Sequence, residues 1–485
     1  MKILEIKGKD WMTGFSRQAG IATTGLFQSM YNFDPFENEG YLQPALAVTD
    51  LTAPATNPIK VITPIIDGTT PKFYAHSETK IYEYLRNTPY TQTDLTAQLD
   101  FTAATGVACA GAISWKGYYI YAQAGDLRSR AIPISGGSDV QILNGGDSSY
   151  QDIRPMCIGS DKNLYIGGWG NGAGGGLAKI TSATGTAGNT LDFFGVDDGF
   201  TVRDIVNDGR YLVLIADNNH ITTTSRVVGD YQCKVYFWDP VRALTTADVI
   251  YDIQDSYLIG AEIVDGKVHI FGYNGIYVCN SANAPQLIWS FLGNSTVTKR
   301  PISPYAITVG NGIIYWGDGG TNGQQVYALR GNVVYSPYQT HQGTTYHTAL
   351  QFSANALLAG TTLPKMSINN IGSTRSNVTV LTTIFQLSQP HKLDFIKVTL
   401  KAPMSSGMEV DLSMFDSNGS LLKDSDSKTF AVVGAKKTLI FKPVGSSNTI
   451  KEFEDFYLTI NPIGGAVIER VAVYATPSDD NSQMI

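Results

Sequence analysis

The sequence is short of cysteine, of charge and of long apolar runs. Its 485 residues include only four cysteines, and 16% of its residues are charged. Cys109, Cys157, Cys233 and Cys279 lie far apart, without the close pairs that bind zinc or the dense spacing of a disulfide framework. We therefore interpret them as small buried hydrophobic residues of a chain that folds in a reducing compartment.

Other absences narrow the class of protein further. No stretch reaches the roughly 18 consecutive apolar residues that a membrane-spanning helix needs. The start of the sequence, MKILEIKGKD, lacks the apolar core and cleavage site of a secretory signal, so we expect none. The formal net charge is −7, whereas binding nucleic acid regardless of its sequence requires a basic surface. These features argue against a membrane protein and against a general nucleic-acid binder.

What the sequence does contain is a repeated pattern of apolar strands joined by short turns. In IVNDGRYLVLIAD, Asp208-Gly209 separates two apolar strands, and a third, CKVYFWD, follows. Asp-Gly between apolar strands predicts a hairpin turn of type I′. The pattern recurs in IVDGKVHIFG, TVGNGIIYWG and ISWKGYYIYA, and more weakly in IGSDKNLYIG and IIDGTTPKFYAH.

The spacing of these turns is nearly constant. The second turn residues of the six clear copies are Gly68, Gly117, Asn163, Gly209, Gly266 and Gly312. They are separated by 49, 46, 46, 57 and 46 residues, and a weaker seventh copy would place Asn355 at the turn. A period of about 40–50 residues with three or four strands is typical of β-propeller blades. We therefore predict an all-β fold with a six- or seven-bladed β-propeller over residues 56–375.

The two ends of the sequence do not follow this period. Residues 1–55 form a lead-in with one expected strand at residues 2–7 and an extended N-terminal arm. Such a segment often supplies a strand to the last blade, which closes the ring and removes an open edge. From residue 376 onward, LDFIKVTL and GMEVDLSM alternate apolar and polar residues, with turns at Asn418-Gly419 and Gly464-Gly465. This period of two predicts a C-terminal antiparallel β-sandwich over residues 376–485.

Few residues of the sequence suggest catalysis. Asp204 in TVRDIV and Glu262 in GAEIV precede hairpin turns and would face the channel of a propeller, with Arg154 near them by register. Two carboxylates that flank a sugar could hydrolyse a glycosidic bond. The alternative, which we favour, is that these groups are solvated or paired with an arginine such as Arg203. We treat Arg154, Asp204 and Glu262 as candidate channel-lining residues and expect no catalytic residue and no enzyme.

Motifs for metals, phosphates and activated nucleophiles are missing from the sequence. Its six histidines are scattered, and the nearby pair His341 and His347 has no third ligand close in sequence. The Gly-rich stretch GGWGNGAGGG is not followed by a helix, so it indicates a loop rather than a dinucleotide site. We expect neither a metal nor a cofactor.

Three features of the sequence carry a resemblance to a known group of proteins. They are NFDPFENEGYLQP at residues 32–44, the series of blade-like repeats, and LDFIKVTL at residues 393–400, which opens the C-terminal sandwich. This layout resembles virion proteins of tailed bacteriophages, specifically the β-propeller tail nozzle or hub proteins of short-tailed phages. The resemblance implies a structural virion protein of the tail, assembled in the host cytoplasm, that forms part of the DNA-ejection conduit.

The resemblance also implies partners. Copies of the chain would form a ring around the tail axis, usually a hexamer in such phages, through heterologous contacts that close on themselves. Other tail proteins, or an adaptor or portal-proximal virion protein, would contact the arm and the propeller edges. DNA would pass through an acidic lumen without specific binding. No membrane insertion is implied.

Two other functions remain open. A carbohydrate- or receptor-binding tail propeller would use exposed aromatic residues as stacking platforms. Trp169, among glycines, is the best candidate for glycan stacking, whereas Tyr273 and Trp316 are more typical of packing between blades. A propeller glycoside hydrolase would use Asp204 and Glu262. Glycan binding without turnover would favour the binder, and turnover lost in Asp204→Asn would favour the hydrolase.

Overall fold

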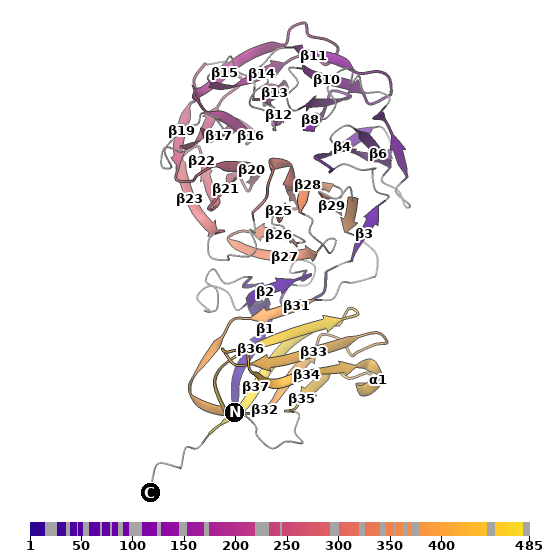
Figure 1. Ribbon diagram of the computed structural model, residues 1–485, viewed down its shortest axis with the longest axis vertical. Coiled ribbons are helices and arrows are strands. Elements are labelled where there is room, and N and C mark those ends of the chain that lie inside the picture. The colour runs from indigo at the N-terminus through magenta and orange to yellow at the C-terminus, as the bar shows by residue number, and fades with distance from the viewer. Residues whose placement is uncertain are drawn as a thin grey trace. The chain divides into compact units, whose positions relative to one another are not determined.

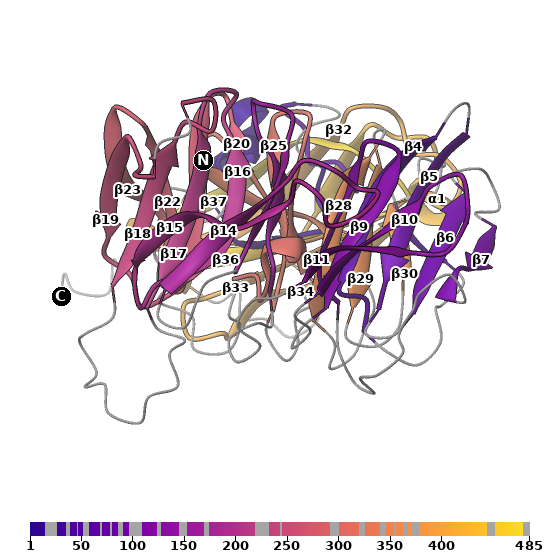
Figure 2. The same cartoon turned by 90° about the horizontal axis from the view of Figure 1, so that it is seen from above.

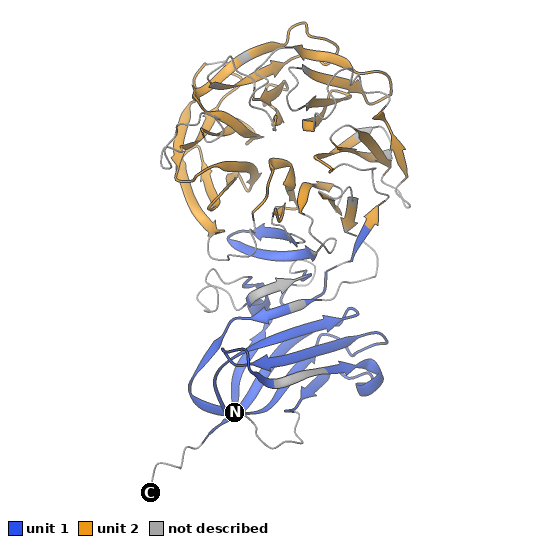
Figure 3. Cartoon of the chain, viewed as in Figure 1, with its two compact units in different colours: residues 1–49, 325–340, 369–485 blue, residues 50–324, 341–368 orange. Residues whose placement is uncertain are grey.

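The computed structural model of the chain is shown in Figures 1 and 2. It describes residues 1–14, 27–34, 39–45, 47–51, 58–67, 70–77, 80–85, 91–96, 109–123, 128–144, 153–168, 174–218, 232–242, 245–291, 300–319, 325–339, 346–353, 356–361, 366–369, 378–443 and 452–478. Two compact units are distinguished in Figure 3: unit 1 contains residues 1–49, 325–340 and 369–485, and unit 2 contains residues 50–324 and 341–368. Among the described residues, none of the helices has the length and hydropathy needed to cross a membrane.

Seven four-stranded antiparallel sheets form the blades of a β-propeller (Figure 1). Blades one to three consist of β4 (Val61–Asp67), β5 (Thr70–His76), β6 (Ile81–Leu85) and β7 (Gln92–Asp94); β8 (Cys109–Trp115), β9 (Tyr118–Gln123), β10 (Arg128–Pro133) and β11 (Val140–Asn144); and β12 (Met156–Ile158), β13 (Leu164–Gly167), β14 (Gly174–Ile180) and β15 (Thr190–Asp198). Blades four to six consist of β16 (Thr201–Asn207), β17 (Leu212–Asp217), β18 (Cys233–Trp238) and β19 (Val249–Ile253); β20 (Leu258–Val264), β21 (Lys267–Gly272), β22 (Gly275–Asn280) and β23 (Asn283–Ser290); and β24 (Ile307–Gly310), β25 (Ile313–Gly317), β26 (Gln325–Arg330) and β27 (Val333–Gln339). The first strand of each of these blades lies innermost in the ring, as β8, β12, β16 and β20 show in Figure 1.

The seventh blade is closed by a strand from the N-terminal lead-in. It consists of β28 (His347–Ser353), β29 (Ala356–Thr361), β30 (Met366–Asn369) and β3 (Val48–Leu51), which precedes the first blade in the sequence. The weak seventh repeat is therefore a blade, and the predicted strand donation is confirmed. Pairing with β3 satisfies backbone groups of β30 that would otherwise form an open sheet edge.

Three of the predicted type I′ turns are confirmed. Both turn residues have positive φ in Lys116-Gly117 (49° and 79°), Asp265-Gly266 (52° and 69°) and Asn311-Gly312 (52° and 74°). In each case the flanking residues pair directly across the two-residue turn. Positive φ at both positions is the condition that matches the twist of the flanking strands.

The type I′ prediction for Asp208-Gly209 is wrong. Only Gly209 has a positive φ, of 98°, and the strand pairing resumes between Asn207 and Leu212, so the loop has more than two residues. The Asp208 carboxylate accepts the backbone N–H groups of Arg210 at 2.9 Å and of the next residue at 2.6 Å. An Asx side chain that bonds its own loop in this way stabilises a wider turn.

Neighbouring blades are held together by continuous apolar layers. Between blades four and five, which we call the 4–5 seam, the buried side chains include Val213, Ile215, Cys233, Val235, Phe237, Ala261, Val268 and Ile270. Full burial of such a side chain contributes about 1.5–3 kcal/mol. Each blade therefore depends on its neighbours for its core, as is usual in repeat folds.

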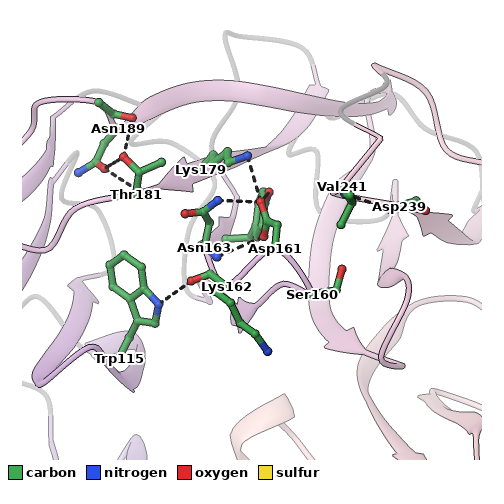
Figure 4. A network of polar contacts seen from close by, with 12 residues as sticks. Trp115, Ser160, Asp161, Lys162, Asn163, Lys179, Thr181, Asn189, Asp239 and Val241 are labelled. Carbon is green, nitrogen blue, oxygen red and sulfur yellow. Dashed lines mark hydrogen bonds and ion pairs between the residues drawn. The ribbon is translucent and has the colours of Figure 1, made fainter.

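Polar contacts between hairpin turns add to this packing (Figure 4). The indole Nε1 of Trp115 in blade two donates to the backbone carbonyl of Lys162 in the turn of blade three at 3.1 Å. In that turn, Asp161 accepts the Asn163 side-chain amide at 2.7 Å and forms an ion pair with Lys179 at 3.1 Å. The carboxylate thus fixes both the turn and the third strand of the blade.

The predicted C-terminal β-sandwich contains nine strands, two of them from the N-terminal segment. One layer has the order β1 (Lys2–Lys7), β37 (Ile468–Pro477), β32 (Phe385–Leu400) and β35 (Thr438–Phe441), and the other contains β2 (Phe27–Tyr31), β31 (Thr379–Thr382), β36 (Glu452–Ile463), β33 (Glu409–Phe415) and β34 (Leu421–Thr429). A short helix, α1 (Phe430–Val433), follows β34. The long strands β32 and β36 pair with each other and join the layers.

The alternation predicted for this sandwich is present. The apolar series Ile396, Val398, Leu400 and the series Val410, Leu412, Met414 are buried. Thr399 and Ser413, which alternate with them, are also buried, because residues on the second face of these central strands are covered as well. The turns at residues 418–419 and 464–465 contain glycines with positive φ.

The N-terminal segment is not an independent arm in its described part. Strand β1 pairs with β37, and β2 pairs with β31. After β1, the 3-10 helix η1 (Gly8–Met12) carries Trp11, which is fully buried, stacks on Phe27 at 5.8 Å and donates its indole N–H to the carbonyl of Glu469 at 3.1 Å. Residues 1–49 therefore group with residues 369–485, and β26 and β27 of the sixth blade are assigned to the same unit. This grouping differs from the expected limits 1–55, 56–375 and 376–485.

Candidate functional site

The innermost strands of all seven blades line a cavity of about 500 Å³ at the centre of the ring. The lining is mixed, with aliphatic side chains such as Ile113 and Leu350 and polar ones such as Asn207 and Gln351. The acidic residues of the lining are Asp204 and Glu262, both half-buried, and its described residues include no lysine, arginine or histidine. The sequence-based placement of these two carboxyls in the channel is thus supported by the structure.

Asp204 is turned toward the next blade by an irregularity in its strand. The register of β16 shifts between Val202 and Asp204, so Arg203 is an extra residue that bulges from the ladder. One Asp204 oxygen, Oδ1, accepts the N–H of Ile205, and the other, Oδ2, accepts the N–H of Ala261 on β20, each at 2.8 Å. Burial raises the pKa of Asp204 to about 7, against the effect of these two N–H groups, which lower it.

Glu262 is the next residue on β20 after Ala261, which donates the hydrogen bond to Asp204. Burial, and to a smaller extent the charge of Asp204, raise the pKa of Glu262 to about 8. Cys157 on β12 is also affected by these two carboxyls. Burial, and to a smaller extent the charges of Asp204 and Glu262, raise the pKa of its thiol to about 12. At pH 7 the thiol is therefore protonated and Glu262 mostly so, whereas Asp204 is divided about equally between its neutral and ionised forms.

The two arginines named from the sequence have other roles. Arg154 does not line the cavity: its side chain is fully buried, and its backbone N–H donates to the carbonyl of Ala110 in blade two at 2.7 Å. Arg203 does not pair with a channel acid. Its Nε and Nη2 donate to both carboxylate oxygens of Asp217, at 3.1 and 3.0 Å, in a buried bidentate pair. The expectation that Arg203 neutralises a channel carboxylate is therefore wrong, because its bulged position directs it to the neighbouring strand.

One end of the channel is spanned by a tyrosine. The 3-10 helix η4 (Pro304–Ala306) is capped by Ser303, whose hydroxyl accepts the N–H of Tyr305 at 3.2 Å. The phenol of Tyr305 then donates to the backbone carbonyl of Arg154, next to blade three, at 2.9 Å. A Cβ on Gly111 would lie 2.0 Å from that carbonyl oxygen and 2.3 Å from the Tyr305 hydroxyl, so only glycine leaves room for this contact.

Sequence reasoning missed this contact and the Arg203–Asp217 pair. The local signal for η4 is the Ser303-Pro304 start of a helical turn, but nothing in the sequence indicates that Tyr305 reaches a residue 151 positions away. Gly111 resembles any other strand glycine until its neighbours are known.

Of the aromatic candidates for glycan stacking, Trp316 is buried and Tyr273 is half-buried. Trp316 is fully buried and packs edge-on against Phe271, with ring centroids 5.4 Å apart. The ring of Tyr273 is covered by the guanidinium of Arg300 at 3.9 Å and contacts Tyr257. Packing between blades is confirmed for Trp316, whereas Tyr273 is half-buried and contacts a tyrosine of its own blade. Trp169 lies outside the described residues.

The other motifs considered from the sequence add no site. Among the described residues, no group of three or more His, Cys, Asp or Glu side chains is arranged to hold a metal ion. His347 is buried at the start of β28, and His341 lies outside the described residues. The end of the Gly-rich stretch forms the start of β14, and the rest of it is likewise outside the described part.

Comparison of the sequence with protein-family profiles and with curated proteins gave no match. Solved structures with a similar fold include a catalytically inactive virginiamycin B lyase from Staphylococcus aureus with quinupristin (TM-score 0.47, 10% identity, 67% of this chain and 98% of that chain covered). The WD40 β-propeller domain of Doa1 has a TM-score of 0.47 at 11% identity over 69% of this chain and 98% of its own. The Cps50 (Swd1) β-propeller domain from Myceliophthora thermophila has a TM-score of 0.45 at 7% identity, over 66% and 98%. At these identities the similarity concerns the propeller fold alone.

Proposed function

We propose that this protein is a non-enzymatic structural component of a bacteriophage tail, a nozzle or hub subunit that forms a ring with copies of itself. The observation that carries the proposal is the connectivity of the chain. The polypeptide passes between the propeller and the sandwich twice, once between β2 and β3 and once between β30 and β31. An appended binding module or enzyme domain needs a single linker, whereas two connections tie the propeller to the sandwich at both of its ends in the sequence.

Two further features support a structural role. Both ends of the described chain are built into sheets. Near its start β1 and β2 belong to the sandwich and β3 to the propeller, and near its end β37 belongs to the sandwich. The channel is spanned by Tyr305, so the propeller channel itself is not the conduit of this proposal. DNA would pass through the lumen of the assembled ring, with a tail or adaptor protein on either side, and the protein would be located in the virion.

The proposal is tested by the mass of the purified protein in solution, measured by light scattering and followed by negative-stain imaging. We expect rings of several subunits, or a monomer that forms rings only when a partner tail protein is added. A strictly monomeric protein that stays monomeric with tail partners and binds or cleaves a polysaccharide would overturn it. Repeating the measurement over a range of protein concentrations separates a closed ring, which has a fixed mass, from open-ended association.

One observation favours a second candidate, a glycoside hydrolase. Asp204 and Glu262 line one cavity and both have raised pKa values, as catalytic acids often do. Against catalysis, both oxygens of Asp204 are occupied by backbone N–H groups. Polysaccharide turnover that is lost in Asp204→Asn and retained in Asp252→Asn, an exposed acid on β19, would establish this candidate.

A further inference from the structure

The three strands of the N-terminal segment all lie at the edges of their sheets. Strand β1 is the last strand of one sandwich layer, β2 is the last strand of the other, and β3 is the last strand of blade seven. Among the described strands, each pairs on one side only, with β37, β31 and β30 respectively. The sheets formed by the strands from β4 onward are therefore continuous without the N-terminal segment.

The segment supplies apolar contacts to parts of the protein that are distant in the sequence. Its buried apolar side chains are Ile6, Trp11, Phe27, Phe33, Leu42, Ala45 and Leu51. The Trp11 indole donates to the carbonyl of Glu469, 458 positions away, and Leu42 exchanges backbone hydrogen bonds of 2.8 and 2.9 Å with Ile468. The segment is joined to these partners only through the chain that follows β3, so the same contacts can form when the two parts belong to different copies.

The rest of the described surface provides little material for a stable contact between copies. Its exposed large apolar side chains are Met1, Val140, Val241, Ile250, Leu287, Ile302, Leu421, Val432 and Ile440, and no two of them share a strand or helix. Permanent interfaces usually bury about 2,000 Å² or more around an apolar core, whereas scattered apolar residues are normal for a surface. The apolar area that could hold a ring together is therefore area that is already buried in the single chain.

We propose that neighbouring copies in the ring exchange residues 1–51, so that β1, β2 and β3 of one copy complete the sandwich and blade seven of the next. The inference rests on the proposed function, because it requires copies held side by side. Exchange of an identical element reproduces the contacts of the single chain and loses no buried area. Each copy gives its segment to one neighbour and receives a segment from the other, which is a heterologous contact that closes into a ring. Removing one subunit then requires Trp11 and Leu51 to leave their buried sites.

A pair of engineered cysteines distinguishes exchange from pairing within one chain. Lys7 on β1 and Arg470 on β37 lie directly opposite each other, at an exposed and a half-buried position. Cysteines at such paired positions are close enough to form a disulfide. In the double variant Lys7→Cys with Arg470→Cys, this disulfide joins two copies if the segment is exchanged and stays within one copy if it is not. The matched control is Lys397→Cys with Ile440→Cys, since these paired positions on β32 and β35 both follow the exchanged segment.

The assembled rings are oxidised, denatured without reductant and separated by mass. We expect the Lys7→Cys, Arg470→Cys variant to give joined chains of two or more times 52.5 kDa, and the control variant and the wild type, with its four native cysteines, to give single chains. A short bis-maleimide linker replaces the disulfide if the thiols do not oxidise, and its products are assessed in the same way. Rings whose Lys7→Cys and Arg470→Cys thiols have reacted while the chains remain single would overturn the exchange and leave the ring intact. A protein that is monomeric with and without tail partners would overturn both the exchange and the proposed function.

Discussion

A glycine and a tyrosine from distant parts of the chain together form a contact between blade two and the segments before blades three and six. Gly111 has no side chain at the point where the Tyr305 hydroxyl meets the carbonyl of Arg154. The hydrogen bond fits only because position 111 carries no methyl group, since packed protein interiors have few gaps that could hold one. Single substitutions at these positions should therefore have measurable effects.

The first residue-scale prediction concerns Gly111→Ala. The new Cβ would lie 2.0 Å from a backbone oxygen that cannot move without disturbing blade three, so we expect a loss of about 1–3 kcal/mol in the free energy of unfolding. Urea unfolding measures it. Gly195→Ala is the matched control, since nothing lies within 4 Å of a Cβ at that strand position. Equal stability of the two variants would contradict the packing at Gly111.

The second prediction concerns Tyr305→Phe. The ring is kept and only the hydroxyl is removed, so the variant should lose one hydrogen bond and leave the Arg154 carbonyl with one donor fewer. We expect a destabilisation of about 0.5–1.5 kcal/mol, measured by urea unfolding. Combined with Gly111→Ala, the effect should be less than additive, because the same hydroxyl is displaced in both cases.

At the scale of the element, β-bulges determine what the innermost strands present to their neighbours. The register shifts near the start of β8, β16, β20 and β28, each time placing one extra residue in the inner strand. In β16 the extra residue is Arg203, whose side chain reaches Asp217 on β17. Asp217 also accepts the N–H of Leu258 at 2.9 Å, so the ion pair links blade four to the first residue of β20.

This arrangement leads to a prediction for the Arg203–Asp217 pair. Arg203→Leu leaves a buried carboxylate without its bidentate partner and should lower stability by about 3–5 kcal/mol. Exchange of both residues, Arg203→Leu with Asp217→Asn, should recover part of the loss, because the amide oxygen still accepts the Leu258 N–H. Thermal unfolding of the single and double variants checks this. A double variant less stable than Arg203→Leu alone would argue against the assigned pairing.

At the scale of the whole molecule, the chain closes its own ring with a strand that precedes the first blade. Leu51, at the end of β3, is buried in one apolar cluster with Ile59, Leu358 and Ile368. This cluster contains residues of blades one and seven, so it forms the join at which the ring closes. The stability of the propeller should depend on this short strand far more than its length suggests.

The closing strand provides a direct test. Leu51→Ala should destabilise the protein by about 2–5 kcal/mol, since it empties a buried site at the join. Thr49→Ala, at an exposed position of the same strand, should change stability by less than about 0.5 kcal/mol. Limited proteolysis and thermal unfolding measure both. An unaffected Leu51→Ala variant would show that β3 does not hold the ring closed.

The sequence alone determined the features that depend on neighbouring residues. The repeat period placed the blades, and the Gly-containing turns at Gly117, Gly266 and Gly312 placed the hairpins, because turn geometry needs only two adjacent residues. The period of two in residues 393–400 likewise indicated the sandwich. The type I′ turn predicted at Asp208 was wrong because the aspartate side chain accepts hydrogen bonds within the loop and so stabilises a longer turn.

Only the tertiary structure decided the rest, because it depends on partners far apart in the sequence. Trp11 meets a carbonyl 458 residues away, and Tyr305 one that is 151 residues away, so neither contact leaves a local pattern. Burial raises the pKa of Asp204, and burial together with the charge of Asp204 in the neighbouring blade raises the pKa of Glu262. The sequence shows which side chains can carry a charge. Their burial and the charges near them depend on how the blades pack in the closed ring.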